Sequence, residues 1–348
     1  MTGPIIDIHT HLAGVGHGGT GCWMSRKKFN SLVYRLLRFK LGLNHVADAA
    51  DVDKTYLSRM EQDLTAATAH GALDGAVIFP HERMYDDAGK PIEALQDMYV
   101  PNEYAIACAE RAMVSGQGGT PRWRFLPAMS VHPYRPDALE ATRKFLAAGA
   151  VAMKWLPSSQ NIDARDKRCG PIFDLLARAK VPLIAHTGGE HTVRVTRKDL
   201  GDPDALIPAL EAGVTVVMAH CGTRSLFFET DWSGRFAALA RKYPNCYGDT
   251  SAFSAPGRTR WANWFIRHGD LLPKLVHGSD YPVPPSAWLS VMTLGFRQAR
   301  RIGGIWSLME RDVAIKRAKG FPDFVFANAA RILPPASLQR WGVSWLTG

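Results

Sequence analysis

The segment Ile5-Ile6-Asp7-Ile8-His9-Thr10-His11-Leu12 contains an apolar run that leads into two histidines separated by one residue. Glycines follow at Gly14 and Gly16. Side chains of a β-strand alternate between its two faces, so His9 and His11 point the same way. We therefore predict a strand over residues 4–9 whose carboxyl end presents two imidazoles that can converge on one metal ion.

Further short apolar runs follow, separated by polar or Gly/Pro-rich stretches and by segments with helical patterns. The other expected strands are 75–79, 124–130, 150–155, 182–186, 214–220, 246–250 and 275–278. The expected helices are 55–70, 91–115, 137–148, 172–180, 205–212, 233–243 and 259–271. Most of the strands are nearly continuous apolar runs, as in a parallel sheet that helices cover. This alternation predicts an α/β fold, a (β/α)8 TIM barrel, with a large doubly wound sheet as the alternative.

Residues 12–54 interrupt the first strand–helix unit. We predict that they form a helical insertion after the first strand of a single barrel domain spanning 1–348. Within them, residues 26–40 read as one basic amphipathic helix that packs over the mouth of the barrel. A helix that binds a membrane surface or a partner protein is the alternative.

Composition excludes several classes of protein. A hydrophobic fraction of 46% and a charged fraction of 21% provide a sizeable core and exclude a disordered chain. No apolar run approaches ~18 residues, so we expect no membrane span. The first residues lack the pattern of a secretory signal, so we expect the cytoplasm. The 5 cysteines are odd in number and form no C-x-x-C, which argues against a disulfide framework and a cysteine zinc site.

The chain is basic. It carries 42 Lys and Arg against 32 Asp and Glu, a net charge of +10. Such a charge attracts anionic substrates, acidic surfaces or nucleic acid, and by itself selects none of them. Because no zinc-finger or RNP signature accompanies the charge, we expect no nucleic-acid partner.

Polar side chains stand at the carboxyl ends of the other expected strands. Lys154 ends the fourth, His186 the fifth and His220 the sixth, and Asp280 follows the eighth. Singly, each has an ordinary explanation: a satisfied polar group, a turn or cap residue, or a lysine that extends to solvent. Together they occupy the end of the barrel that carries the active site in (β/α)8 enzymes.

The ordered set His9-Thr10-His11, His186, His220 and Gly278-Ser279-Asp280-Tyr281-Pro282 resembles the amidohydrolase superfamily, metal-dependent hydrolases with a (β/α)8 barrel. The closer resemblance is to its amidohydrolase 2 branch, which also contains nonoxidative decarboxylases. The resemblance extends from about residue 4 to about residue 335, and related barrels imply a homodimer.

The resemblance also implies roles for individual residues. His9, His11 and His186 would be metal ligands, and Asp280 would contact the metal and move the proton of the attacking water. His220 would be either a ligand of a second metal or a hydrogen-bonding catalytic residue. Lys154 would be carboxylated and bridge two metals if the site is binuclear, and would not bridge if it is mononuclear.

The ligand types indicate the chemistry. Imidazole and carboxylate without thiolate suit Zn²⁺, Mn²⁺ or Fe²⁺, and we expect zinc, as one ion or two. Zn²⁺ lowers the pKa of its water from ~16 to ~7. Asp280 would pass the proton of this water to the leaving group, and His220 could stabilise the oxyanion.

We therefore predict a hydrolase that acts on a C–N, C–O or lactone bond of a small molecule. The small molecule could be anionic. A nonoxidative decarboxylase with the same ligands and a non-catalytic barrel that binds a metal or ligand are the alternatives.

Other polar residues follow the strand ends. Glu190 could orient a ligand histidine, as residues behind metal ligands do. One of Arg224, Arg258 and Arg260 could bind a substrate carboxylate with two hydrogen bonds. His132 ends the third expected strand and is a further candidate for substrate contact.

One rival motif is present. Gly14-Val15-Gly16-His17-Gly18-Gly19 fits the G-x-G-x-x-G pattern of dinucleotide-binding folds. That motif should open a helix and should be followed by an acidic residue at the end of the second strand. Thr20-Gly21-Cys22-Trp23 does not open a helix, and Phe79-Pro80 ends the second expected strand. A loop after the metal-binding strand is the simpler interpretation.

Overall fold

The computed structural model describes residues 3–43, 49–115 and 124–343. In these residues parallel strands form a three-stranded sheet, in the order β1-β3-β5, and a five-stranded sheet, in the order β10-β9-β8-β7-β6. The strands are β1 (Ile6–His11), β3 (Gly75–Phe79), β5 (Arg124–Pro127), β6 (Met153–Trp155), β7 (Leu183–His186), β8 (Val216–Ala219), β9 (Cys246–Asp249) and β10 (Leu275–Val276). A short antiparallel pair, β2 (Trp23–Met24) with β4 (Met98–Tyr99), lies apart from them.

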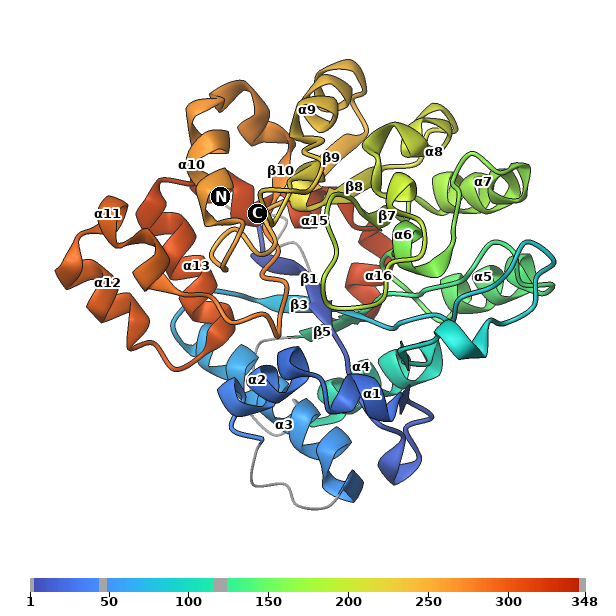
Figure 1. Cartoon of the computed structure of the whole chain (residues 1–348), viewed down its shortest axis with the longest axis horizontal. Helices are drawn as coiled ribbons and strands as arrows, with labels where there is room; N and C mark the ends of the chain where they lie inside the picture. Colours follow the sequence, from blue (N-terminus) through green and yellow to red (C-terminus); the bar gives the residue numbers. More distant parts are fainter. Residues whose placement is uncertain (1–2, 44–48, 116–123, 344–348) are drawn as a thin grey trace.

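Backbone hydrogen bonds join the two sheets at both of their outer edges. Between β5 and β6, Val151 N donates to Pro127 O at 2.9 Å. Between β10 and β1, Ile8 N donates to His277 O at 3.0 Å, and Asp280 N donates to His9 O at 3.0 Å. Figure 1 shows the strands in the middle of the molecule with helices around them. The predicted TIM barrel is confirmed.

The strands are buried because helices cover them. Every residue of β3, β6, β7 and β8 is buried, which explains their continuous apolar sequences. The helices are α3 (Ala49–Ala69), α4 (Asn102–Ser115), α5 (Ala138–Ala147), α6 (Pro157–Gln160), α7 (Gly170–Ala179), α8 (Ile207–Glu211), α9 (Ser233–Lys242), α10 (Thr259–Arg267), α11 (Val291–Leu294), α12 (Phe296–Gly303), α13 (Leu308–Lys319), α14 (Asp323–Ala327), α15 (Ala329–Ile332) and α16 (Pro335–Arg340). None of the described helices is both long and apolar enough to cross a membrane.

Several expected boundaries were wrong, among them those of β1 and α4. The first strand continues to His11, because Thr10 and His11 still pair with Ile78 and Phe79 of β3. The helix expected over 91–115 begins only at Asn102. Before it lie one 3₁₀ turn and strand β4, since Pro101 restricts the preceding residue to extended backbone.

The segment after β1 contains α1 (Arg26–Phe29) and α2 (Leu32–Lys40), two helices where one was expected. The break occurs because Ser31 has extended backbone and its Oγ accepts from Tyr34 N at 3.4 Å, capping α2. Asp53 of α3 holds the start of the segment by accepting from Val15 N at 2.6 Å and Thr20 Oγ1 at 2.6 Å. Residues 44–48 of the expected insertion lie outside the described residues.

Candidate metal centre

Three side chains converge where β1 meets the end of β10. His9 Nε2 lies 3.1 Å from His11 Nε2, and Asp280 Oδ1 lies 3.4 Å from the first of these nitrogens and 3.3 Å from the second. One ligand atom from each residue lies within 4.8 Å of the others. Two imidazole nitrogens and a carboxylate oxygen form a donor set that suits a divalent transition metal.

His9 is held in the form that can bind a metal. Its Nδ1 lies 2.7 Å from Asp249 Oδ2 at the end of β9. Burial lowers the pKa of His9 to about 4, and the charge of Lys154 adds to this effect while Asp249 opposes it. The neutral ring therefore carries its hydrogen on Nδ1 and donates it to Asp249. Its Nε2 is left unprotonated and faces Asp280, His11 and Lys154 Nζ, and this arrangement fits a bound cation.

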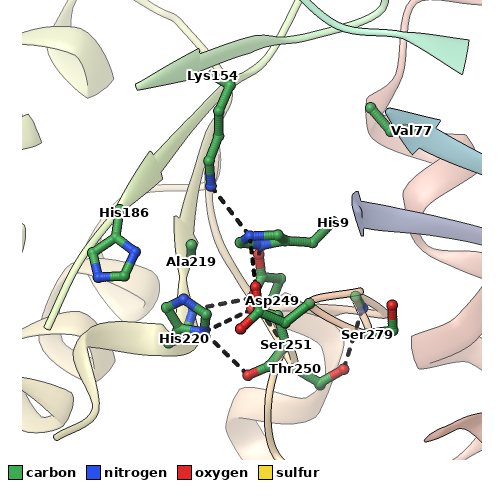
Figure 2. A network of polar contacts seen from close by, with 12 residues as sticks. His9, Val77, Lys154, His186, Ala219, His220, Asp249, Thr250, Ser251 and Ser279 are labelled. Carbon is green, nitrogen blue, oxygen red and sulfur yellow. Dashed lines mark hydrogen bonds and ion pairs between the residues drawn. The ribbon is translucent and has the colours of Figure 1, made fainter. Parts of the chain in front are cut away.

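Asp249 and Ser251 both contact His220, as Figure 2 shows. Ser251 Oγ donates to Asp249 Oδ1, and this uses the only hydrogen of the hydroxyl. His220 Nδ1, which lies 2.8 Å from Ser251 Oγ and 3.2 Å from Ser251 O, must therefore be the donor in that contact. Burial lowers the pKa of His220 well below its ordinary value. The neutral ring thus leaves its Nε2 unprotonated.

Asp249 is one functional candidate that the sequence reasoning missed. It accepts from His9 Nδ1, from His220 N at 2.9 Å, and from Ser251 N at 3.1 Å. Burial by itself would raise the pKa of Asp249, but His9, His220 and Ser251 outweigh burial and lower it. Its position at the end of the seventh expected strand was the available signal.

Lys154 extends from β6 toward the same centre. Its Nζ lies 3.3 Å from His9 Nε2 and 4.6 Å from the centre of the Phe79 ring. Burial lowers the pKa of Lys154 to about 8, although the charges of Asp249 and Asp280 oppose this shift. A larger fraction of neutral amine is therefore present near neutral pH than for an exposed lysine.

His186 and His220 lie next to each other, at the ends of the neighbouring strands β7 and β8. Their ring centres are 4.8 Å apart, and the His220 ring is 5.3 Å from that of His9. His186 Nδ1 lies 3.3 Å from Glu190 Oε2, and its Nε2 lies 3.2 Å from Gly189 O. Both nitrogens of His186 thus face oxygen atoms of its own loop. His186 and His220 stand beside the three-residue group and are not members of it.

Asp280 and His220 have strained backbones. Their φ angles are 68° and 60°, in the left-handed region that residues other than glycine rarely adopt. Such a conformation costs about 1–3 kcal/mol and persists where the surroundings fix it. Asp280 is fixed by its hydrogen bond to His9 O, and His220 by its hydrogen bond to Asp249.

A cavity of about 230 Å³ opens onto this centre, and His11, His186, Glu190, His220 and Asp280 line it. Two further lining residues are Arg258, one of the three arginines considered from sequence, and His81, which the sequence reasoning did not identify. His81 follows β3, so the end of a strand was again the available signal.

Three of the residues expected near the substrate, His132, Arg224 and the exposed Arg260, do not line this cavity. His132 is buried, and its ring nitrogens are occupied by Gln160 O at 2.7 Å and Tyr134 N at 3.1 Å. Arg224 turns back on its own loop and donates to Phe227 O at 2.9 Å. His132 and Arg224 both follow strand ends, but hydrogen bonds direct their side chains elsewhere.

Comparisons with known proteins agree with this architecture. No curated protein matches the chain. Among solved structures, an uncharacterized TIM-barrel protein from Bordetella bronchiseptica is 15% identical with a TM-score of 0.56, covering 97% of this chain and 98% of that one. A probable 2-pyrone-4,6-dicarboxylic acid hydrolase from Acinetobacter baumannii, with citric acid bound, is 12% identical with a TM-score of 0.51, covering 97% and 99%. A putative 2-pyrone-4,6-dicarboxylic acid hydrolase from Pseudomonas putida is 14% identical with a TM-score of 0.50, covering 99% and 100%.

At these identities the solved structures establish the fold alone. The sequence match is more specific, because residues 6–301 match the family described as amidohydrolase. That range includes both histidines of β1 and the Asp280 that faces them. The chain therefore belongs to the amidohydrolase family of enzymes.

Proposed function

We propose that the protein is a metal-dependent hydrolase that cleaves a C–N, C–O or lactone bond of a small molecule. The observation that carries this proposal is the convergence of His9 Nε2, His11 Nε2 and Asp280 Oδ1, with Asp249 Oδ2 2.7 Å behind His9 Nδ1. Zinc is the expected ion, with manganese or iron as alternatives. His9, His11 and Asp280 would hold it. His220 and a carboxylated Lys154, with His186, would hold a second ion.

Asp280 would be the proton carrier. When bound, a divalent ion lowers the pKa of a water molecule and polarises the carbonyl group under attack. Burial would raise the pKa of Asp280, but the hydrogen bond with His11 and the charges of His9, His11 and Arg258 outweigh burial and lower it. The ionised carboxylate can therefore accept a proton from the attacking water and transfer it to the leaving nitrogen or oxygen.

Removal of metal is expected to abolish turnover. Dialysis against a chelator should lower kcat by more than about a hundredfold, and zinc, manganese or iron should restore it. His11→Ala should lower the metal content, whereas His70→Ala should not, because His70 is exposed and pairs with Glu310. Full turnover of metal-free protein would refute the proposal.

Metal analysis and mass spectrometry of native protein test the number of ions. Two equivalents together with the added mass of carbon dioxide on Lys154 would indicate a bridged pair, and one equivalent a single ion. Product analysis tests the reaction: release of carbon dioxide without addition of water would assign a decarboxylase instead.

Arg258 is the proposed contact for an anionic substrate. It is 7% exposed, its Nη2 donates to Gly189 O at 2.6 Å, and its Nε has no hydrogen-bond partner among the described residues. Arg258→Gln should raise KM for a carboxylate-bearing substrate by about 10- to 100-fold, with a smaller change in kcat. Arg260→Gln is the matched control, since Arg260 is exposed. Equal effects of the two variants on KM would contradict this assignment.

A further inference from the structure

The cavity has two chemically different parts. Its polar part consists of strand-end residues, among them His11, His220, Arg258 and Asp280. Its other part is built largely by the segment between β1 and α3, which contributes Leu12, Val15, Met24, Phe29, Leu37 and Leu41. We call these six side chains the apolar wall. The wall faces the same space as the candidate metal centre, so one ligand can touch both.

Most polar groups near the apolar wall already have partners, whereas Arg38 Nε has none among the described residues. Tyr56 OH donates to His11 O at 2.6 Å, and Tyr34 OH contacts Met98 Sδ at 3.4 Å. Arg38 donates to Phe29 O at 3.2 Å and stacks over the Phe29 ring at 4.0 Å. A polar ligand group would find few partners beside the wall, and water there would be poorly hydrogen-bonded. A hydrocarbon group gives up no hydrogen bonds on entering such a space, and its transfer out of water is favourable.

We infer that the substrate is amphiphilic. Its hydrolysable group, an amide, ester or lactone, faces His11 and Asp280, and an uncharged aliphatic or aromatic portion of the same molecule lies against the apolar wall. The position of the hydrolysable group rests on the proposed function. The apolar portion follows from the lining of the cavity alone.

Binding of straight-chain carboxylates tests this inference without requiring turnover. The probes are butanoate, hexanoate, octanoate and decanoate, and calorimetry with metal-loaded protein measures Kd for each. Burial of one methylene is worth about a threefold to fourfold gain in affinity, so Kd should fall by that factor per methylene until the wall is covered. A Kd that does not depend on chain length would overturn the inference.

Two adjacent leucines of α2 supply a matched pair of variants. Leu37 lines the cavity, whereas Leu36 points to solvent and is 54% exposed. Leu37→Gln should weaken octanoate binding by about tenfold and leave butanoate binding nearly unchanged, because only the longer chain reaches the wall. Leu36→Gln should bind the whole series like the parent protein. Equal effects of Leu37→Gln on both probes would count against the wall as the binding surface.

Two further measurements separate misfolding and the proposed function from this inference. Leu37→Met keeps the site apolar and should restore the chain-length dependence, which a general loss of folding in Leu37→Gln would not predict. The same series is then measured with Asp280→Asn protein, whose wall is intact. If Kd depends on chain length but turnover needs no metal, the proposed function alone is refuted. Metal-dependent turnover with no chain-length dependence would refute the inference alone.

Discussion

Asp280→Asn is expected to lower kcat by about a thousandfold in a protein that still folds. The carboxylate lies 3.3 Å from His11 Nε2 and 3.4 Å from His9 Nε2, and its lowered pKa keeps it ionised. An amide has the same shape but cannot take a proton from water. Asparagine also tolerates the left-handed backbone at this position, where φ is 68°. Steady-state kinetics of the purified variant measures kcat, metal analysis measures the bound metal, and circular dichroism reports whether the variant is folded.

Asp270→Asn provides the control for Asp280→Asn, because Asp270 has a largely exposed side chain and pairs with Arg241. It should retain full activity. If Asp280→Asn keeps its metal and loses turnover, a barrel that merely binds a metal is excluded. If it keeps more than about a tenth of the parent kcat, Asp280 is not the proton carrier.

Asp249→Asn is expected to weaken metal binding by about 10- to 100-fold. Asp249 accepts hydrogen bonds from the His9 ring, the His220 backbone and Ser251, so every hydrogen in this cluster points toward it. An amide must direct its own N–H group at one of these partners. If that group faces His9 Nδ1, the ring takes the opposite tautomer and protonates Nε2, which removes the lone pair that would bind the metal.

Competition with a chromophoric chelator measures the metal Kd of Asp249→Asn, and thermal unfolding reports its stability. Asp74→Asn is the matched control, since Asp74 accepts from Ile5 N at 2.8 Å just before β1, remote from the centre. Its metal Kd should equal that of the parent. A lower melting temperature of Asp249→Asn with an unchanged metal Kd would show that Asp249 only stabilises the fold.

Strand ends were the most informative part of the sequence. The carboxyl ends of parallel barrel strands meet at one face, and the structure brings His9, His11 and Asp280 together there. The roles assigned to these residues remain predictions. Asp249 escaped notice because a lone carboxylate after glycine reads as a turn residue. Asp249 pairs with His9, which lies 240 residues away in the sequence, so no local sequence motif indicates this contact.

Side-chain direction was harder to predict than position. His132 and Arg224 follow strand ends as expected, yet hydrogen bonds turn each away from the cavity. The His132 ring is held by Gln160 O and Tyr134 N, and Arg224 is held by Phe227 O of its own loop. In α2, leucines occur on two faces, so the pattern of apolar residues could not tell that Leu37 faces the cavity and Leu36 faces solvent. The end of α1 depends on Ser31, whose capping role competes with a good helical pattern on both sides.

The segment that Asp53 anchors is continuous in sequence, whereas the three residues of the candidate metal centre come from the ends of separate strands. Recognition of the hydrocarbon and cleavage of the bond are therefore encoded in different places. Grafting the segment between Leu12 and α3 onto a related barrel would transfer the substrate selectivity. The reaction chemistry of the recipient barrel would stay unchanged.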